Sequence, residues 1–313
     1  MPALILIALA GLAAQLVDGG IGMGFGVTST TILIFLAGLG PAQASAVVHV
    51  AQLGTTAISG ISHWRFGNVN WRFVLFLGVP GAIGGFIGAT LLSNLPLDAA
   101  QPVTATLLSI IGLNLVWRFS RGRVRRSSAE KAHYSSPFLV GIGSVGGVVD
   151  ATGGGGWGPV TTSTLMGLGR EHPRYVVGTV SASEFLVTLG SSIGFAIGLW
   201  DEIIAQLPAV LALLIGGSIA APVAAWIVSR INPVALGGLV GTGIVALNLP
   251  KVLGGITQLA DATPIDTVWP LQVLVLLAGI AMTIRGARRR ARELATDPTL
   301  PTRTAQPDSV RAV

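Results

Sequence analysis

The chain contains no cysteine in its 313 residues. This absence excludes a disulfide framework and any metal site built on thiolates. Charged residues are also scarce, because Asp, Glu, Lys and Arg together make up 10% of the sequence, whereas a soluble domain has roughly 25%. With 51% hydrophobic residues, the composition is that of an all-α polytopic membrane protein, and the lipid bilayer is its expected environment.

Motifs for ATP-driven or metal-dependent chemistry are absent as well. The chain has no nucleotide-binding P-loop and no HExxH, and the spacings of its four histidines give no metal constellation. We therefore expect neither an enzyme nor an ATP-driven pump, and we expect no cofactor.

The formal net charge of +6 comes from basic residues in loops between apolar runs and in the C-terminal tail. Basic loops of this kind are typical of membrane orientation rather than of a nucleic-acid interface. We therefore expect no nucleic-acid partner.

An internal repeat divides the apolar part of the chain into two similar halves. The segments 17–34 and 149–166 align without gaps at one constant offset, and each holds a glycine-rich break preceded by an aspartate. Identical residues occupy the aligned pairs Val17/Val149, Asp18/Asp150, Gly22/Gly154, Gly24/Gly156, Gly26/Gly158, Thr30/Thr162 and Leu33/Leu165.

The apolar runs of each half predict helices. They cover 3–17, 27–37, 41–63, 71–93 and 102–117 in the first half, and 136–149, 160–168, 173–199, 203–229 and 233–249 in the second. A helix rises about 1.5 Å per residue, so the arms beside each break are too short for roughly 30 Å of hydrocarbon. Each half is expected to hold a glycine-broken short helix pair, as a re-entrant hairpin or two short spans, and three spanning helices.

Lysine and arginine positions predict the orientation of these helices. If each broken pair enters and returns on one side and the N-terminus is external, Lys251 is the one basic residue of the interhelical segments that faces outward. With three further crossings per half, the halves begin on opposite sides and form inverted-topology repeats. We expect a bacterial inner-membrane protein with an external N-terminus and a cytoplasmic C-terminus.

The chain is accordingly divided into five segments. They are a first membrane repeat at 1–118, a basic cytoplasmic loop at 119–135, a second membrane repeat at 136–250, an external loop with an extra C-terminal transmembrane helix at 251–285, and a basic, disordered cytoplasmic tail at 286–313. The extra helix has no counterpart in the first half.

The glycine breaks are the first candidate for a substrate site. Non-helical backbone at membrane depth survives only where it is buried in protein or lines a cavity. Each break leads into a helix start with free N–H groups and nearby hydroxyls, which suits an anion, although the glycines could simply let helices pack closely. The candidate contacts are Gly24, Gly26, Thr28, Ser29, Gly156, Gly158, Thr161 and Thr162.

An aspartate precedes each break, at Asp18 and Asp150. An acid inside a membrane segment is a functional hypothesis by default, here as a coupling site for a proton or cation. Aspartate before glycine also caps backbone N–H groups in an Asx-turn, and both interpretations stay open. An acid beside an anion repels it unless protonated, which suggests proton coupling.

A polar stripe follows each break, on the next long helix. Its members are spaced by three and four residues, which places them on one face. They are His49, Gln52, Thr56 and Ser59 in the first half and Ser181, Glu184, Thr188 and Ser191 in the second. We predict that His49, Gln52 and Ser181 contact the substrate. Glu184 is predicted to take part in coupling, whereas His63 falls near a loop and is expected to be solvated.

The following helix of each half carries small residues four apart, including Gly84/Gly88 and Gly216/Ala220. Such spacing lets helices in lipid approach closely, so we assign these residues to packing.

The duplicated glycine-rich segments, the basic central loop and the two similar halves resemble the sulfite exporter TauE/SafE family of transmembrane anion transporters. The resemblance covers residues 3–250 and leaves the last helix and the tail outside. It implies export or uptake of small sulfur-containing anions, such as sulfite or organic sulfonates, with proton coupling. The first half departs from the family's glycine–proline ending, because Val27 stands where the second half has Pro159, so the halves need not engage substrate equally.

Together these features predict a secondary transporter that exports a small anion, sulfite or an organosulfonate, by alternating access with proton coupling. An anion channel and a transporter of a small carboxylate are the alternatives. A homo-oligomer is compatible with the sequence.

Overall fold

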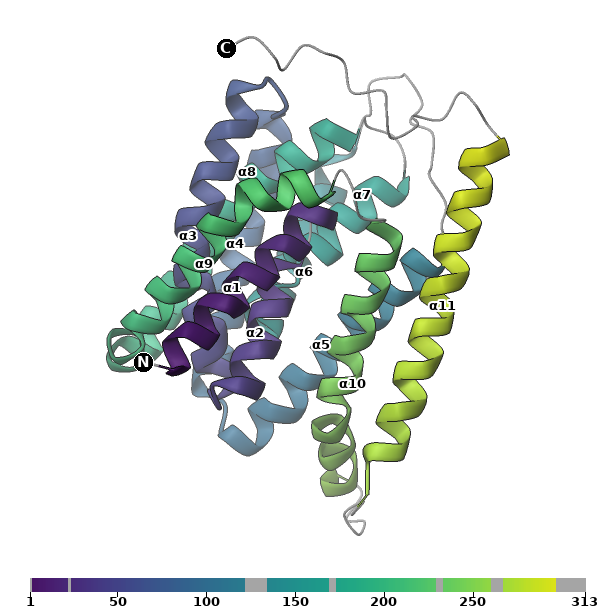
Figure 1. Cartoon of the computed structure of the whole chain (residues 1–313). Coiled ribbons are helices and arrows are strands. Elements are labelled where there is room, and N and C mark those ends of the chain that lie inside the picture. The colour runs from purple at the N-terminus through teal and green to yellow at the C-terminus, as the bar shows by residue number, and fades with distance from the viewer. Residues whose placement is uncertain are drawn as a thin grey trace.

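The computed structural model is helical throughout the residues it describes, which are 2–21, 24–121, 134–168, 173–228, 233–259 and 267–296 (Figure 1). The first half contains α1 Pro2–Ile21, α2 Phe25–Leu36, α3 Pro41–Arg65, α4 Trp71–Asn94 and α5 Leu97–Ser120. The second contains α6 Ser136–Gly153, the π-helical turn η1 Gly158–Thr162, α7 Ser163–Leu168, α8 Pro173–Ala205, α9 Leu207–Val228 and α10 Pro233–Leu259. Helix α11, Trp269–Thr296, comes last.

The predicted fold class, an all-α polytopic membrane protein, is confirmed. Within the described ranges, six helices are long and apolar enough to cross a membrane, namely α3, α4, α5, α8, α10 and α11. Shorter apolar stretches lie at Leu4–Leu16, Phe25–Leu36 and Leu207–Ala220. The first two belong to the first broken pair. Helix α2 is short, with 12 residues, whereas α1 continues past the predicted end at residue 17 to Ile21 and has 20 residues, about 30 Å at 1.5 Å per residue.

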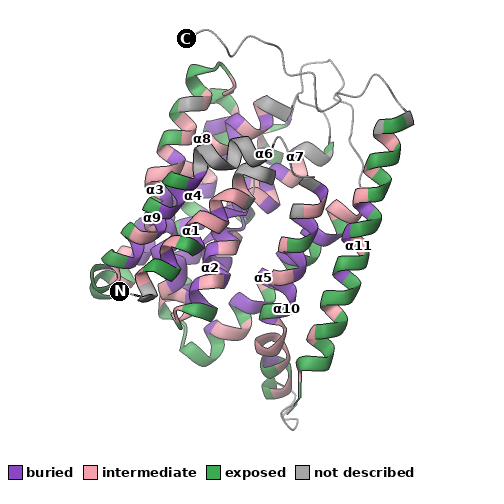
Figure 2. Ribbon diagram, in the orientation of Figure 1, coloured by how far each residue is buried: buried purple, intermediate pink, exposed green. Residues whose placement is uncertain are grey.

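Large apolar side chains cover the outside of the molecule. Ile83 and Leu91 on α4 are exposed, as are Leu274 and Leu277 on α11. Figure 2 shows the buried residues gathered between the helices and the exposed ones along the outer side of α11. Soluble proteins rarely expose apolar surface of this extent, whereas lipid covers it without cost.

Helix α11 extends further than the sequence predicts. The sequence analysis gives a disordered tail from residue 286, whereas the helix continues to Thr296. The added stretch is rich in Ala, Arg, Leu and Glu, which are strong helix formers. Arg289 also pairs with Glu293 one turn later, at 3.2 Å. Residues 297–313, and most of the predicted basic loop at 119–135, lie outside the described residues.

The two halves interlock through equivalent helices. Helix α1 packs along α9, and its repeat counterpart α6 packs along α4. Helices α3 and α8, which are also equivalent, lie against each other, as do α5 and α10. Exchange of the halves maps the α1–α9 contact onto the α6–α4 contact and maps the α3–α8 and α5–α10 contacts onto themselves, as a pseudo-two-fold axis requires. The opposite membrane orientation of the halves stays a prediction.

The ends of the helices are consistent with the predicted orientation. In Figure 1, α1 begins at the lower end of the molecule and α11 ends at the upper end. The turn between α3 and α4, flanked by Arg65 and Arg72, lies at the same upper end as the arginine-rich end of α11. Basic residues therefore gather at one end, and that end is the predicted cytoplasmic side.

Glycines let helices of different halves lie directly on each other. A β-carbon on Gly147 of α6 would collide with the backbone of Gly81 in α4, and one on Gly84 would collide with that of Ser144. Gly216 approaches the backbone of Ala8 in the same way and so joins α9 to α1. The small residues of α4 and α9 thus have the packing role that their spacing predicts.

We expect the variant Gly147→Leu to lose the contact between α4 and α6, because neither backbone can move without separating the helices. Overpacking of this kind costs about 1–3 kcal/mol or more. Size-exclusion chromatography in detergent should show little monodisperse protein. The control is Gly141→Leu on the same helix, where an added β-carbon meets no atom within 4 Å. Equal yields of the two variants would contradict the assignment.

Candidate functional site

The two glycine breaks lie against each other. Gly26 at the start of α2 approaches Gly155, between α6 and η1, so closely that a β-carbon on either would overlap the other's backbone. The φ angles of Gly24, Gly154 and Gly155 are 127°, 67° and 136°, a region that glycine adopts readily and other residues do not. Thr30 adds a hydrogen bond of 2.7 Å to the carbonyl of Gly154. Both breaks therefore need glycine for their backbone path and for their contact.

Aspartates tie each break to the helix that follows. The Oδ1 of Asp150 accepts a hydrogen bond of 2.8 Å from the N–H of Trp157. In the first half, the N–H of Phe25 donates to Asp18. Phe25 and Trp157 are equivalent positions of the repeat, so the same cap is built twice. The aspartates therefore cap backbone N–H groups, but not in the predicted Asx-turn, because each bond spans seven residues instead of two.

A cavity of about 250 Å³ lies beside the contact between the breaks. Both halves contribute walls, through α1, α2 and α3 on one side and the second break, η1 and α8 on the other. A water occupies about 30 Å³ of liquid, so a small solute fits. The lining residues are Gln15, Asp18, Gly24, Phe25, Gly26, Ser59, His63, Gly155, Gly158, Thr162, Val177, Val180, Ser181 and Glu184.

The lining of the cavity is polar and acidic. Two carboxylates face it, from Asp18 on α1 and Glu184 on α8. Among the described lining residues, His63 is the single side chain that can carry a positive charge. Hydroxyls and an amide complete the polar surface, so a solute finds several hydrogen-bonding groups and an excess of acid.

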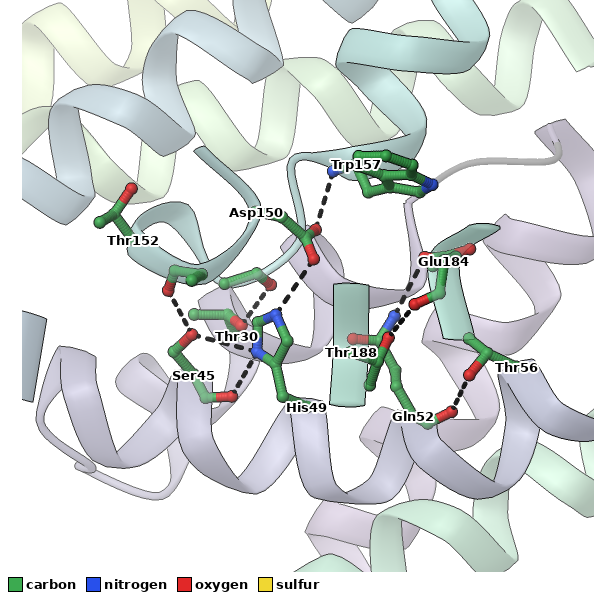
Figure 3. A network of polar contacts seen from close by, with 12 residues as sticks. Thr30, Ser45, His49, Gln52, Thr56, Asp150, Thr152, Trp157, Glu184 and Thr188 are labelled. Carbon is green, nitrogen blue, oxygen red and sulfur yellow. Dashed lines mark hydrogen bonds and ion pairs between the residues drawn. The ribbon is translucent and has the colours of Figure 1, made fainter. Parts of the chain in front are cut away.

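Gln52 and Glu184 meet at the centre of the repeat symmetry. They are equivalent positions, and Gln52 Nε2 lies 3.5 Å from Glu184 Oε1 (Figure 3). A residue that contacts its own counterpart must lie at the axis that relates the halves. Gln52 is buried beside this axis, whereas Glu184 also reaches the cavity.

The equivalent region across the axis is filled with side chains. The counterparts of Asp18, Ser181 and His63 are Asp150, His49 and Phe195, respectively. All three counterparts are buried. His49 Nε2 lies 3.1 Å from Asp150 Oδ2, and the His49 ring centroid lies 5.7 Å from that of Phe195. The cavity therefore lies on one side of the axis, and the equivalent space on the other side is filled by packed side chains.

Both ring nitrogens of His49 face oxygen acceptors. Nδ1 lies 2.8 Å from the carbonyl of Ser45, and Nε2 faces Asp150 (Figure 3). The Ser45 hydroxyl donates elsewhere, to the carbonyl of Ala151 at 2.6 Å. The His49 ring is therefore fixed at both nitrogens, between its own helix and the second break.

Comparison with known proteins agrees with this architecture. The profile of the family described as sulfite exporter TauE/SafE matches residues 7–251. The chain belongs to the TauE/SafE family. It is therefore a membrane transporter of that family, and the match covers both repeats.

Two curated relatives of this family member come from Bacillus subtilis (strain 168). The chain is 41% identical over 290 residues to probable membrane transporter protein YtnM, covering 90% of this chain and 94% of the relative. It is 28% identical over 179 residues to probable membrane transporter protein YdhB, covering 56% of this chain and 70% of the relative. No solved structure matches the chain.

Half of the predicted site residues of this TauE/SafE transporter line the cavity. They are Asp18, Gly24, Gly26, Gly158, Thr162, Ser181 and Glu184. They come from five different elements or breaks, and the tertiary structure brings them together.

The other half of the predicted site residues do not line the cavity. They are Thr28, Ser29, His49, Gln52, Asp150, Gly156 and Thr161. Gly156 packs against Val149, and Thr161 donates to the carbonyl of Trp157 at 2.5 Å. Successive helical residues point about 100° apart, so the neighbours of a lining residue face other helices.

The cavity also contains polar residues that the site prediction omits. His63 is predicted to be solvated, yet it lines the cavity, and its Nδ1 is buried. The signal is present in the sequence, because Gln52, Thr56, Ser59 and His63 continue one spacing of three and four residues. Gln15 lies three residues before Asp18 on α1 and shares its face.

We expect Asp150→Ala to destabilise the transporter, because it leaves His49 and the N–H of Trp157 without their acceptor. Removal of one partner from a buried pair costs about 3–5 kcal/mol. Asp150→Asn keeps an oxygen for the Trp157 N–H and should lose less. The apparent unfolding temperature in detergent measures both. An Asp150→Ala protein that unfolds at the wild-type temperature would show that the pair is not needed for stability.

Proposed function

We propose that the protein is a proton-coupled secondary transporter that exports a small anion, with sulfite or an organosulfonate as its substrate. The observation that carries the proposal is the polar cavity at the contact between the two repeated breaks, together with its packed counterpart across the axis. Membership of the TauE/SafE family supports this substrate class.

Alternating access accounts for a cavity on one side and packed equivalent residues on the other. Repeats related by an axis in the membrane plane can exchange conformations around a fixed site. In the exchanged state, His49, Asp150 and Phe195 would separate and line a cavity. The present cavity would close as Ser181 and His63 move toward Asp18.

The open side is the cytoplasmic side in this proposal. Ser59 and His63 line the cavity from the last two turns of α3. Arg65 ends that helix, and the orientation prediction places it in the cytoplasm. With that orientation, we propose an inward-facing state, in which substrate enters from the cytoplasm for export.

The anion lies at the first turn of α2 in this proposal. Gly24, Phe25 and Gly26 form that part of the wall. The N–H of Phe25 is bonded to Asp18, and the other N–H groups of the first turn, with the positive end of the helix dipole, favour an anion. The hydroxyls of Thr162 and Ser181 lie on the opposite half and can donate to the same ligand.

Asp18 and Glu184 support proton coupling, because both line the cavity. An anion in the same cavity as two carboxylates is repelled unless the acids bind protons first. Glu184 lies at the axis, where either side of the membrane can reach it in turn. In this proposal Glu184 is the principal coupling group, with Asp18 beside it.

Neither an enzyme nor a channel fits the geometry as well. Residues 190–194 spell GxSxG, but they lie inside α8, whereas a catalytic nucleophile elbow needs a strand-to-helix turn. A channel needs a continuous path, and the region of His49 and Phe195 is fully packed.

The test is transport by purified protein in proteoliposomes. We expect sulfite or an organosulfonate to accumulate against its gradient when a pH gradient is imposed, and to stop accumulating when a protonophore is added. Sulfate, thiosulfate and small carboxylates serve as competitors that define the substrate. Flux that only runs downhill and ignores the pH gradient would identify a channel instead.

We expect Glu184→Gln to change the pH dependence of this transport more than its substrate affinity, because the amide keeps the shape of the side chain and cannot release a proton. Rates are measured across a pH series at saturating and limiting substrate. The control is Glu202→Gln, an exposed acid on the same helix. An unaltered pH profile for Glu184→Gln would remove this residue from coupling.

A further inference from the structure

His63 is the one side chain among the described lining residues that can carry a positive charge toward an anion in this cavity. We propose that protonated His63 contacts the transported anion directly on the open side, an inference that rests on the proposed transport function. It assigns a substrate contact to a position outside the glycine breaks.

The charge of the cavity lining favours this assignment. Asp18, His63 and Glu184 are the ionisable groups among its described lining residues, and two of the three are acids. An anion needs a charged partner to offset its lost hydration, since an unpaired buried charge is costly. Hydrogen bonds from a cation to an oxyanion are shorter and stronger than neutral ones. His63 is positioned to make such a bond.

The hydrogen bonds of the two histidines differ in a way that supports the same role. His49 uses both ring nitrogens, toward Ser45 and Asp150. The Nδ1 of His63 is buried and has no hydrogen-bond partner among the described residues. Buried polar atoms are normally satisfied, but this side chain is not held by a hydrogen bond of its own at Nδ1, so the part of the ring that lines the cavity can turn toward a ligand there.

The repeat shows that this contact is specific to the first half. Phe195 occupies the position equivalent to His63, and it is fully buried. His49 occupies the position equivalent to Ser181, which lines the present cavity. If the halves exchange conformations, the cavity on the other side gains His49 where this one has Ser181. Each access state then offers one histidine to the anion, from α3 in both cases.

Binding of thiosulfate, sulfite and a two-carbon sulfonate to purified protein tests the proposal, by ligand-induced change in the unfolding temperature across a concentration series. We expect His63→Gln to weaken anion binding about tenfold or more, the loss typical of a charge-assisted hydrogen bond. His63→Arg should retain binding, because arginine is always protonated and presents several donors. Arg65→Gln is the matched control, since it removes an exposed charge two residues away.

Unchanged affinity in His63→Gln overturns the proposal while leaving the transport function intact. An equal loss in Arg65→Gln also overturns it, because surface charge then explains the effect. If the wild-type protein binds none of the anions, the proposed function fails and the His63 contact fails with it.

A second measurement needs no variant and so does not depend on folding. Diethyl pyrocarbonate modifies accessible histidines, and peptide mass spectrometry reports modification at His63 of the wild-type protein. We expect the bound anion to protect His63. Equal modification with and without a saturating anion contradicts a direct contact.

Discussion

The backbone contact between Gly26 and Gly155 is the constraint on which the site depends. No side chain fits between the two breaks, so two chain segments that are distant in sequence meet without any intervening group. Irregular backbone inside a bilayer must be shielded and hydrogen-bonded. Each break obtains its bonds from its own half, through the aspartate cap, and one from the other half, through Thr30 and the Gly154 carbonyl. The cavity forms next to this joint because the helix starts diverge from it.

The duplicated halves have the same scaffold and different polar chemistry. Glycines and capping aspartates repeat, since both breaks need the same backbone path. Gln52 faces Glu184 across the axis, and His63 stands where the second half has Phe195. A strictly repeated chain would place identical charges on both sides of the membrane. The differences instead give each side of the axis its own set of ionisable and polar groups.

Much of the architecture follows from patterns that a single chain reveals. Apolar runs bounded by glycine, proline or charged residues correspond to helices. Inside a bilayer the backbone N–H and C=O groups find no water, and a helix pairs them within the same segment. The place of the aspartates before glycine indicates a capping role, although the capped N–H groups lie seven residues on, across the break. Helix α11 runs past its apolar part because helix propensity and an ion pair continue into the basic segment. Where the helix ends depends on these local contributions to its stability, which amino-acid composition alone describes poorly.

Sequence alone was sufficient to locate the breaks, the repeat, the polar stripes and the acids, since these are local signals with a period or a duplication. It could not distinguish Asp18, which lines the cavity, from Asp150, which is buried against His49. It also could not separate Ser181 from His49 or assign His63 to the cavity. Equivalent positions carry equivalent local signals, and only the packing of one half against the other makes one member of each pair accessible and buries its counterpart. The asymmetry of the site is therefore a property of the folded molecule, set by which of the two equivalent spaces the side chains fill.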